Sequence, residues 1–400
     1  MTRYNFDKIT NRKGTNCLKY DFAVERGKPA DVLPLWVADM DFPVSEEISK
    51  SLHAAVEHGI YGYTQPKDAY YNVVMNWMER NHNWKTEREW IVKTPGVVFA
   101  LGAAVKAFTD PGDAILIQNP VYYPFTNIIR DNDRRVVDNT LIYEKTAGQS
   151  GDNGYRIDFE DFERKLEQEH IKLFILCNPH NPVGRVWTAE ELQKLGEICL
   201  RHHVIVVSDE IHNDFVYPGY EHTVFATVDP RFAEFTVTCT APSKTFNLAG
   251  LQISNIFIPN EKLRKAFQTE IDKTGYDEPN ALGIVACEAA YRAGEDWLDQ
   301  LRAYLLKNLN FLRNFLQEKI PQIHLVEPEG TYLVWLDCSE LEITGKELDQ
   351  FILDKAGLWL DGGSMFGPSG AAFQRVNIAC PQATLELALN KLKAAVDNLK

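Results

Sequence analysis

Helix-like and strand-like segments alternate along the first three quarters of the chain. Apolar residues recur every four positions after the candidate N-cap Ser45 and stop at Gly59, which predicts a helix between them. Pro95 and Gly96 open another helix, which ends before 110–112. The alternation predicts a mostly parallel sheet covered by helices on both faces, a large three-layer α/β domain. The expected strands are the apolar runs at 114–117, 172–177, 204–208, 235–239 and 253–258, and amphipathic helices at 158–168 and 189–202 separate some of them.

The pattern changes near residue 295. A long helix is predicted at 295–318, and the remaining segments are short and mixed, which is typical of a smaller α+β domain. We expect residues 1–45 to pack on this small domain, residues 46–290 to form the large domain and residues 291–400 the small one. The small domain's other predicted elements are strands at 332–338, 358–363 and 374–380 and helices at 346–355 and 383–399.

Composition narrows the class of protein. The 400 residues carry a formal charge of −14, so we expect neither nucleic acid nor an anionic membrane as a main partner. No apolar run approaches the roughly 18 residues of a membrane-spanning helix, and the first residues lack the apolar core of a secretion signal. The seven cysteines are scattered and never spaced as CxxC, which favours reduced thiols and a cytoplasmic location.

Chemistry-bearing residues follow four of the predicted strands. In open parallel sheets, ligands bind beyond the carboxyl ends of the strands. The sequence has no GxGxxG, no phosphate-binding GxxxxGK[ST], no serine-hydrolase elbow and no HExxH or other metal spacing. The strand ends together predict a site for a planar, anionic, nitrogen-containing cofactor held by a lysine. They supply aromatic rings at 119–123, an amide at 178–184, a carboxylate and an imidazole at 209–212, and a lysine with hydroxyls at 240–246.

Several motifs carry a resemblance to a known family. The motifs are PLWVADMDFP (34–43), HGIYGYTQP (58–66), PGVV (95–98), NPVYYPF (119–125), CNPHNPVGR (177–185), SDEIH (208–212) and APSKTFNLAGLQ (241–252). With these motifs in this order the chain resembles fold-type I pyridoxal-phosphate (PLP) enzymes, and more narrowly the carbon–sulfur lyases of the MalY/PatB cystathionine β-lyase type. The resemblance implies a fold-type I, PLP-dependent transferase-like architecture, PLP as cofactor, an amino-acid substrate and a homodimer with composite sites.

The resemblance assigns five residues to the cofactor ring. Lys244 corresponds to the Schiff-base lysine, and burial among apolar neighbours would lower its pKa and free its amine for attack on a carbonyl. Asp209 would pair with the ring nitrogen, and Asn181 and His212 would reach the ring oxygen. Tyr122 would stack on the ring. The alternatives are a helix cap for Asp209, turn chemistry for Asn181 and a structural role for His212.

The phosphate of the cofactor needs donors of its own. The backbone amides of Val97 and Val98 lie at a predicted helix N-terminus, where anions bind, and Ser243 adds a hydroxyl. Tyr63 resembles a tyrosine that reaches the phosphate of a neighbouring subunit. Tyr61 is the alternative, and ordinary interface packing is the other reading of Tyr63.

The resemblance also assigns residues to the substrate. Arg375 matches the arginine that binds the substrate carboxylate, for which a guanidinium fork is suited. Ala38 would offer its backbone N–H to the same carboxylate, whereas Asp39 is expected to be structural. Tyr123 is the other aromatic of the pair that begins at Tyr122, and the sequence leaves open which of them stacks. The chain departs from the wider superfamily at Gln252, where an arginine near the phosphate is common.

The resemblance implies α,β-elimination from cystathionine and related L-cysteine S-conjugates, giving pyruvate, ammonia and a thiol. An aminotransferase of the same fold is the main alternative, because the spacing of Lys244, Asp209 and Arg375 suits both reactions. A regulator that binds a transcription factor is a second alternative. The preferred conjugate and the biosynthetic or catabolic role stay open.

Overall fold

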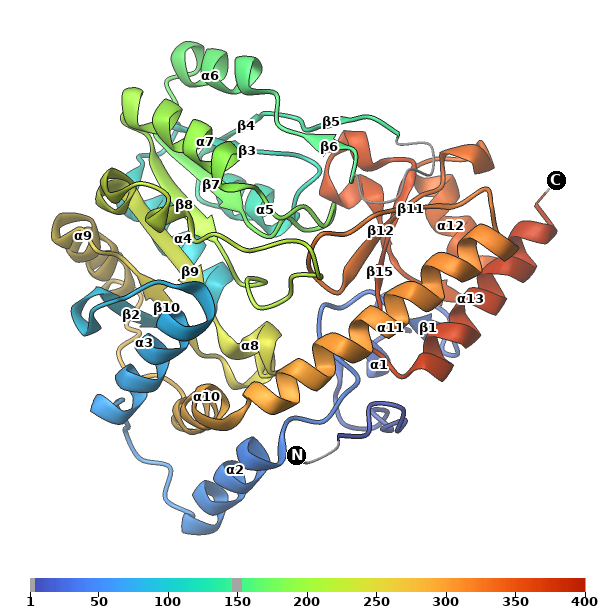
Figure 1. Cartoon of the computed structure of the whole chain (residues 1–400), viewed down its shortest axis with the longest axis horizontal. Helices are drawn as coiled ribbons and strands as arrows, with labels where there is room; N and C mark the ends of the chain where they lie inside the picture. The colour runs from blue at the N-terminus through green and yellow to red at the C-terminus, as the bar shows by residue number, and fades with distance from the viewer. Residues whose placement is uncertain (1–3, 146–152, 400) are drawn as a thin grey trace.

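A computed structural model describes residues 4–145 and 153–399 of the chain. Its centre is a seven-stranded sheet in the order β2-β10-β9-β8-β7-β3-β4 (Figure 1). Within this sheet only β10 runs antiparallel to its neighbours, so the predicted mostly parallel sheet is confirmed. The strands are β2 (Ile91–Thr94), β3 (Ala114–Ile117), β4 (Arg135–Asp138), β7 (Leu173–Cys177), β8 (Ile205–Asp209), β9 (Thr236–Thr240) and β10 (Ser254–Phe257).

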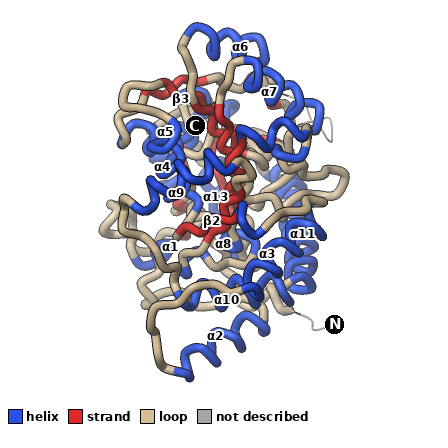
Figure 2. The backbone as a smooth tube through the Cα atoms, turned by 90° about the vertical axis from the view of Figure 1, so that its left-hand side faces the viewer, coloured by secondary structure: helices blue, strands red, loops and turns tan. Residues whose placement is uncertain are grey.

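Both faces of this sheet are buried under helices, as Figure 2 shows from the side. Side chains alternate between the two faces along a strand, so Ile115 and Ile117 join one apolar cluster while Ala114 and Leu116 join another. Continuous burial on both faces explains why the strands are apolar runs without polar alternation. One face is covered by α4 (Val97–Phe108), α5 (Pro124–Asp131) and α9 (Glu261–Asp272), and the other by α6 (Phe159–Gln168) and α7 (Ala189–Arg201).

The helices before and after the central sheet pack together. The Ser45 hydroxyl accepts a hydrogen bond from the N–H of Ile48, and Gly59 ends the helix with φ 72°, which confirms the predicted start and stop. The long helix α11 leads from this group to the second domain (Figure 1). The group comprises α2 (Glu46–His58), α3 (Asp68–His82), α10 (Ala281–Ala293) and α11 (Glu295–Lys319).

A four-stranded antiparallel sheet in the order β11-β12-β15-β14 forms the core of the second domain. The prediction of one strand over 358–363 is wrong, because the chain changes partners there. Residues 358–359 pair with the N-terminal segment, and residues 361–362 pair with β15. The elements are β11 (His324–Val326), β12 (Leu333–Asp337), α12 (Lys346–Asp354), β13 (Leu358–Trp359), β14 (Asp361–Gly362), β15 (Phe373–Asn377) and α13 (Gln382–Asp397).

The N-terminal segment lies against this second domain. Its strand β1 (Leu33–Pro34) pairs in parallel with β13, and the ring of Trp36 stacks on Trp359 with 4.4 Å between centroids. The domain boundaries at 45 and 290 stay a prediction. Among the described residues, none of the helices combines the length and the apolar character needed to span a membrane. The remaining short elements are α1 (Leu18–Asp21), β5 (Ile142–Tyr143), β6 (Tyr155–Arg156) and α8 (Pro242–Thr245).

Candidate active site

A cavity of about 170 Å³ lies at the carboxyl ends of the central strands. Three of the predicted site residues, Tyr63, Tyr123 and Arg375, are not in its lining. The other predicted residues all line it, although the sequence places them up to 206 positions apart. These are Ala38, Val97, Val98, Tyr122, Asn181, Asp209, His212, Ser243 and Lys244, and further lining residues include Pro95, Gly96, Cys177, Ile211, Ala249 and Ile253.

Lys244 lies on the short helix α8, which follows strand β9 directly. Its Nζ donates a hydrogen bond to the carbonyl of Ala38 at 3.1 Å. Burial lowers the pKa of Lys244 to about 8, against an opposing effect of the Asp39 carboxylate. The ring of Phe246, two residues further along the chain, packs against Trp77 with 5.5 Å between the ring centroids.

Asp209 is the last residue of β8 and is buried. Burial raises its pKa to about 7, although the N–H of Ile211 donates to its carboxylate at 3.2 Å and the charge of Lys244 lowers the pKa. A cation placed beside this carboxylate would restore its ionised form.

His212 follows Asp209 on the same side of the cavity and is buried as well. Burial, assisted by the positive charges of Lys244 and Arg375, holds its pKa well below the ordinary value, so the imidazole is neutral. Its Nδ1 has no hydrogen-bond partner among the described residues. A buried nitrogen left without a partner is costly in a folded protein, which favours a ligand group at this position.

Asn181 and Arg375 are joined by a hydrogen bond. The Nη1 of Arg375 donates to the Oδ1 of Asn181 at 2.9 Å, so the amide nitrogen of Asn181 is left as a donor for the cavity. The Nη2 of Arg375 donates to the carbonyl of Trp36 at 3.0 Å and also contacts the carboxylate of Asp361. Its Nε is buried without a partner among the described residues. Arg375 is thus held directly behind Asn181 with part of its fork free.

The two adjacent tyrosines have different surroundings. Tyr122 lines the cavity, whereas Tyr123 packs against Tyr122 and Phe366, with 5.5 Å and 6.0 Å between the ring centroids. This arrangement favours Tyr122 as the ring that faces a cofactor, and that role stays a prediction.

The sequence predicts an anion site at the start of helix α4, and that role of Val97 and Val98 stays a prediction. Gly96 is the N-cap and has no side chain to bond the first amides, so the N–H groups of Val97 and Val98 are not capped by a side chain. Tyr63 lies outside the cavity on the segment between α2 and α3, where it is 96% exposed. Tyr61, also exposed, donates its hydroxyl to the carbonyl of Val56.

Two acids that stabilise the site, Asp361 and Asp214, were not predicted from the sequence. Asp361 forms a buried ion pair with Arg375, and its signal was an acid at the end of the apolar run LWLD. Asp214 accepts a hydrogen bond of 2.6 Å from the hydroxyl of Thr245, the neighbour of Lys244, and one of 3.0 Å from His82. No local sequence pattern could reveal these contacts of Asp214, because its partners Thr245 and His82 come from separate helices, α8 and α3.

Comparisons with known proteins show the family to which the chain belongs. The model of the family "Aminotransferase class I and II" matches residues 30–392. The chain belongs to this family. This member is 46% identical to the cystathionine beta-lyase PatB of Bacillus subtilis (strain 168), over 98% of this chain and 100% of that protein. These findings confirm the predicted family.

Two solved structures of similar proteins confirm the fold. The first is cystalysin from Treponema denticola, which contains a pyridoxal 5'-phosphate cofactor. It matches with a TM-score of 0.95 and 38% identity over all of both chains. The second is the PLP-bound C–S lyase from Staphylococcus hominis. It matches with a TM-score of 0.91 and 35% identity over 99% of this chain and 98% of that one.

Proposed function

We propose that this family member is a PLP-dependent carbon–sulfur β-lyase. It cleaves cystathionine and related L-cysteine S-conjugates with one water to a thiol, pyruvate and ammonia. The observation that carries the proposal is the position of Lys244, a lysine of low pKa in a cavity between a buried carboxylate, Asp209, and the segment that Arg375 holds. The similarity to PatB and to the C–S lyase of S. hominis supports the elimination reaction.

The described residues fit PLP in three respects. The cofactor's aldehyde requires an amine, its ring nitrogen a carboxylate and its phosphate a set of donors. The cavity offers Lys244, Asp209 and the uncapped amides of Val97 and Val98, with the hydroxyl of Ser243. The unpartnered Nδ1 of His212 is a further polar atom for which such a ligand would provide a contact. When bound, PLP withdraws electrons from the α-carbon of an amino-acid substrate and so makes its proton removable.

Lys244 is assigned the proton transfers. Its amine takes the proton from the α-carbon, and a pKa of about 8 leaves about a tenth of the amine unprotonated at pH 7, far more than an ordinary lysine has. Asp209 stays ionised beside a cationic ring nitrogen, because the attraction offsets the effect of burial on its pKa. Tyr122 limits the motion of the ring by covering one side of the cavity.

Arg375 is assigned the substrate carboxylate. Its contacts with Asn181, Trp36 and Asp361 fix the guanidinium, and the Nε edge remains for a carboxylate oxygen. The Ala38 backbone lies on the same side and narrows the space for the α-substituents. Tyr123 packs behind Tyr122 and supports this end of the cavity. Together these contacts hold the bond from the α-carbon to hydrogen near Lys244, and a thiolate leaves from the β-carbon.

We also propose a homodimer in which Tyr63 reaches the phosphate site of the partner subunit. The support is an exposed apolar segment between α2 and α3, which a monomer would leave in water. Its large side chains are Ile60, Tyr61 and Tyr63, and with Val56 in the last turn of α2 they are between 51% and 96% exposed.

Pyruvate release from a substrate panel tests the lyase. The panel is cystathionine, cystine, cysteine, aspartate and alanine, each with and without an added keto acid. We expect pyruvate and ammonia from cystathionine without any keto acid, and none with the variant Lys244→Ala. If turnover appears only when a keto acid is added, the protein is an aminotransferase and the lyase proposal is wrong.

A further inference from the structure

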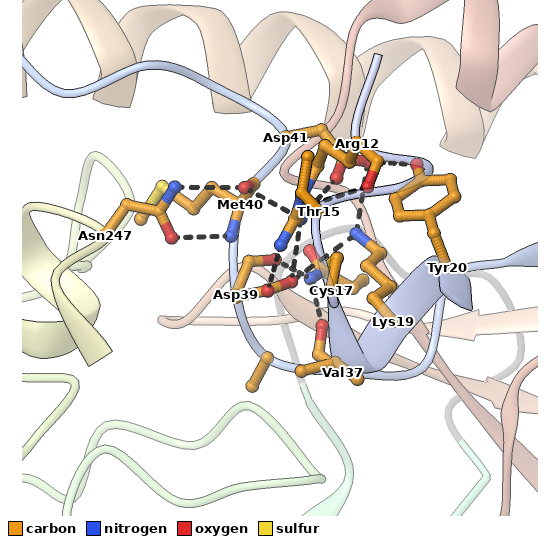
Figure 3. A network of polar contacts seen from close by, with 12 residues as sticks. Arg12, Thr15, Cys17, Lys19, Tyr20, Val37, Asp39, Met40, Asp41 and Asn247 are labelled. Atoms are coloured by element: carbon orange, nitrogen blue, oxygen red, sulfur yellow. Dashed lines mark hydrogen bonds and ion pairs between the residues drawn. The ribbon is translucent and has the colours of Figure 1, made fainter. Parts of the chain in front are cut away.

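Four charged side chains outside the cavity form a cluster that joins the N-terminal segment to the loop 36–42 (Figure 3). The Nη1 of Arg12 lies 2.7 Å from a carboxylate oxygen of Asp41, and its Nη2 bonds the carboxylate of Asp39. The Nζ of Lys19 lies 3.1 Å from Asp41 and 3.8 Å from Asp39. Two cations from the N-terminal segment therefore balance two carboxylates of the loop.

The cluster is buried at its centre. The side chain of Lys19 is fully buried, and that of Asp41 is 5% exposed. The hydroxyl of Tyr20 also donates to Asp41 at 2.9 Å. A buried charge is costly unless it is paired, so removing one member leaves an uncompensated charge, whereas removing an opposite pair leaves none. The N-terminal segment and the loop are thus coupled through charge.

The loop itself is held through its backbone. Each carbonyl from residue 36 to residue 40 accepts at least one hydrogen bond from a side chain, and two of the donors are the arginine and the lysine of the site. The side chains of Arg375 and Lys244 are therefore held by the backbone of this loop. The donors are Arg375 to Trp36, Asn377 to Val37 and Asp39, Lys244 and Tyr332 to Ala38, and Arg12 and Asn247 to Met40.

We propose that Arg12 and Lys19 are positioning residues for the substrate side of the site: by neutralising Asp39 and Asp41 they fix the backbone at Ala38. This inference rests on the proposed function for its link to catalysis. Arg12 and Lys19 do not line the cavity, so they act through the loop. If the cluster served only the stability of the fold, a substitution in it would speed hydrogen exchange in the loop no more than in the rest of the chain.

The cluster also affects the charge balance at the lysine. Lys244 faces the carboxylates of Asp39 and Asp209 and the cation of Arg375, with the neutral His212 beside it. The Asp39 carboxylate raises the pKa of Lys244 against the effect of burial. The cations of Arg12 and Lys19 screen that carboxylate. Losing one of them leaves a net negative cluster, which favours the protonated amine and shifts the pKa of Lys244 upward.

The variant Lys19→Met tests this role in the holoenzyme. We expect hydrogen exchange in residues 36–42 to accelerate about tenfold or more while the strands of the central sheet keep their protection. We expect KM for cystathionine to rise about tenfold with a smaller change in kcat, because the proposed function assigns Arg375, which bonds the carbonyl of Trp36 in the loop, to the substrate carboxylate. The pH midpoint of the bound cofactor's visible absorbance should move upward.

Two further variants separate charge from bulk. Lys19→Met combined with Asp41→Asn restores a neutral cluster of Arg12 and Asp39, so most of the loop protection and the KM should return. The matched control is Lys165→Met on α6, where Lys165 is paired with Asp161 at 2.7 Å. Figure 1 shows α6 far from β1, which directly precedes the loop. This control should change neither KM nor the exchange of the loop.

The proposal is overturned if Lys19→Met leaves the loop and KM unchanged. It is also overturned if every segment exchanges faster to the same degree, or if the double variant is worse than the single one. Should Lys19→Met fail to fold, Arg12→Gln at the more exposed position gives the same readouts. A wild-type protein that releases no pyruvate refutes the proposed function, while the exchange and absorbance results still decide the role of the cluster.

Discussion

The part of the site that carries Asp209 and Lys244 follows directly from buried strands, whereas the part that carries Ala38 and Arg375 depends on contacts between distant segments. Asp209 ends β8, in register with Cys177 of β7 and Cys239 of β9, and this fixes its position. Arg375 is fixed by a bond to Trp36, 339 positions away. We call the first part, Tyr122, Asn181, Asp209 and Lys244, the cofactor side, and the second, loop 36–42 with Arg375, the substrate side.

The two sides are expected to control different kinetic quantities. Rigid strand ends suit groups that must hold a cofactor and move a proton with little reorganisation. A loop whose backbone is fixed by side-chain hydrogen bonds suits recognition, since it holds the groups that contact the substrate in one arrangement. Changes on the cofactor side should therefore reduce kcat and cofactor retention, and changes on the substrate side should mainly raise KM.

The largest effect is expected for Lys244→Ala. Lys244 is the one lysine among the described residues that line the cavity, and without its amine the cofactor's aldehyde and the α-proton lose their assigned partner, so kcat should fall by about 10⁴-fold or more. Pyruvate release and the visible absorbance of the purified protein measure the loss. The control is Lys262→Ala on the exposed start of α9. If Lys244→Ala keeps more than a few per cent of the wild-type activity, Lys244 does not have the role assigned to it.

A pH dependence comes next. The apoprotein can bind the cofactor's aldehyde only through the unprotonated amine of Lys244. With a pKa lowered by burial to about 8, this form is depleted as the pH falls. The rate of cofactor uptake should therefore drop about 50-fold between pH 8 and pH 6 and level off above pH 9. A rapid-mixing absorbance assay measures it. A midpoint near 10, the ordinary lysine value, would show that the cavity does not desolvate Lys244.

Arg375→Lys tests the substrate side. A lysine cannot replace the fork that bonds Asn181, Trp36 and a carboxylate together. We expect KM for cystathionine to rise about 30-fold, equivalent to one charge-assisted hydrogen bond of about 2 kcal/mol, with kcat changed less. Steady-state kinetics measure both, and Arg164→Lys on the surface of α6 is the control. A loss confined to kcat would contradict the division between the two sides.

The smallest effect is expected at the subunit contact. Tyr63→Phe removes one hydroxyl from the proposed phosphate site of the partner subunit, so the cofactor Kd should rise about tenfold. Tyr61→Phe is the matched control, because the hydroxyl of Tyr61 is already bonded to Val56 within its own chain. A mixed dimer of one Tyr63→Ala subunit and one Lys244→Ala subunit gives a sharper test. Composite sites would leave one intact site in each mixed dimer and restore activity, and no restoration would contradict them.

The contrast between the two sides also explains how far the sequence could be interpreted. Asp209 and Lys244 were predictable because each follows a continuous apolar run, and parallel strands bring their carboxyl ends to one edge. The role of Asp361 was not, since the run over 358–363 divides between two sheets. The pairing of Arg12 and Lys19 with Asp39 and Asp41 has no local pattern. It arises only when the N-terminal segment folds onto the loop.

The ratio of the products formed from cystathionine decides between elimination and transamination. Purified wild-type protein with bound PLP and no keto acid should release thiol, pyruvate and ammonia in equal amounts, one of each per cystathionine consumed. Thiol titration and enzymatic assays of pyruvate and ammonia on the same sample give the ratio. Thiol without pyruvate, or consumption that stops after one turnover until a keto acid is supplied, would contradict the account.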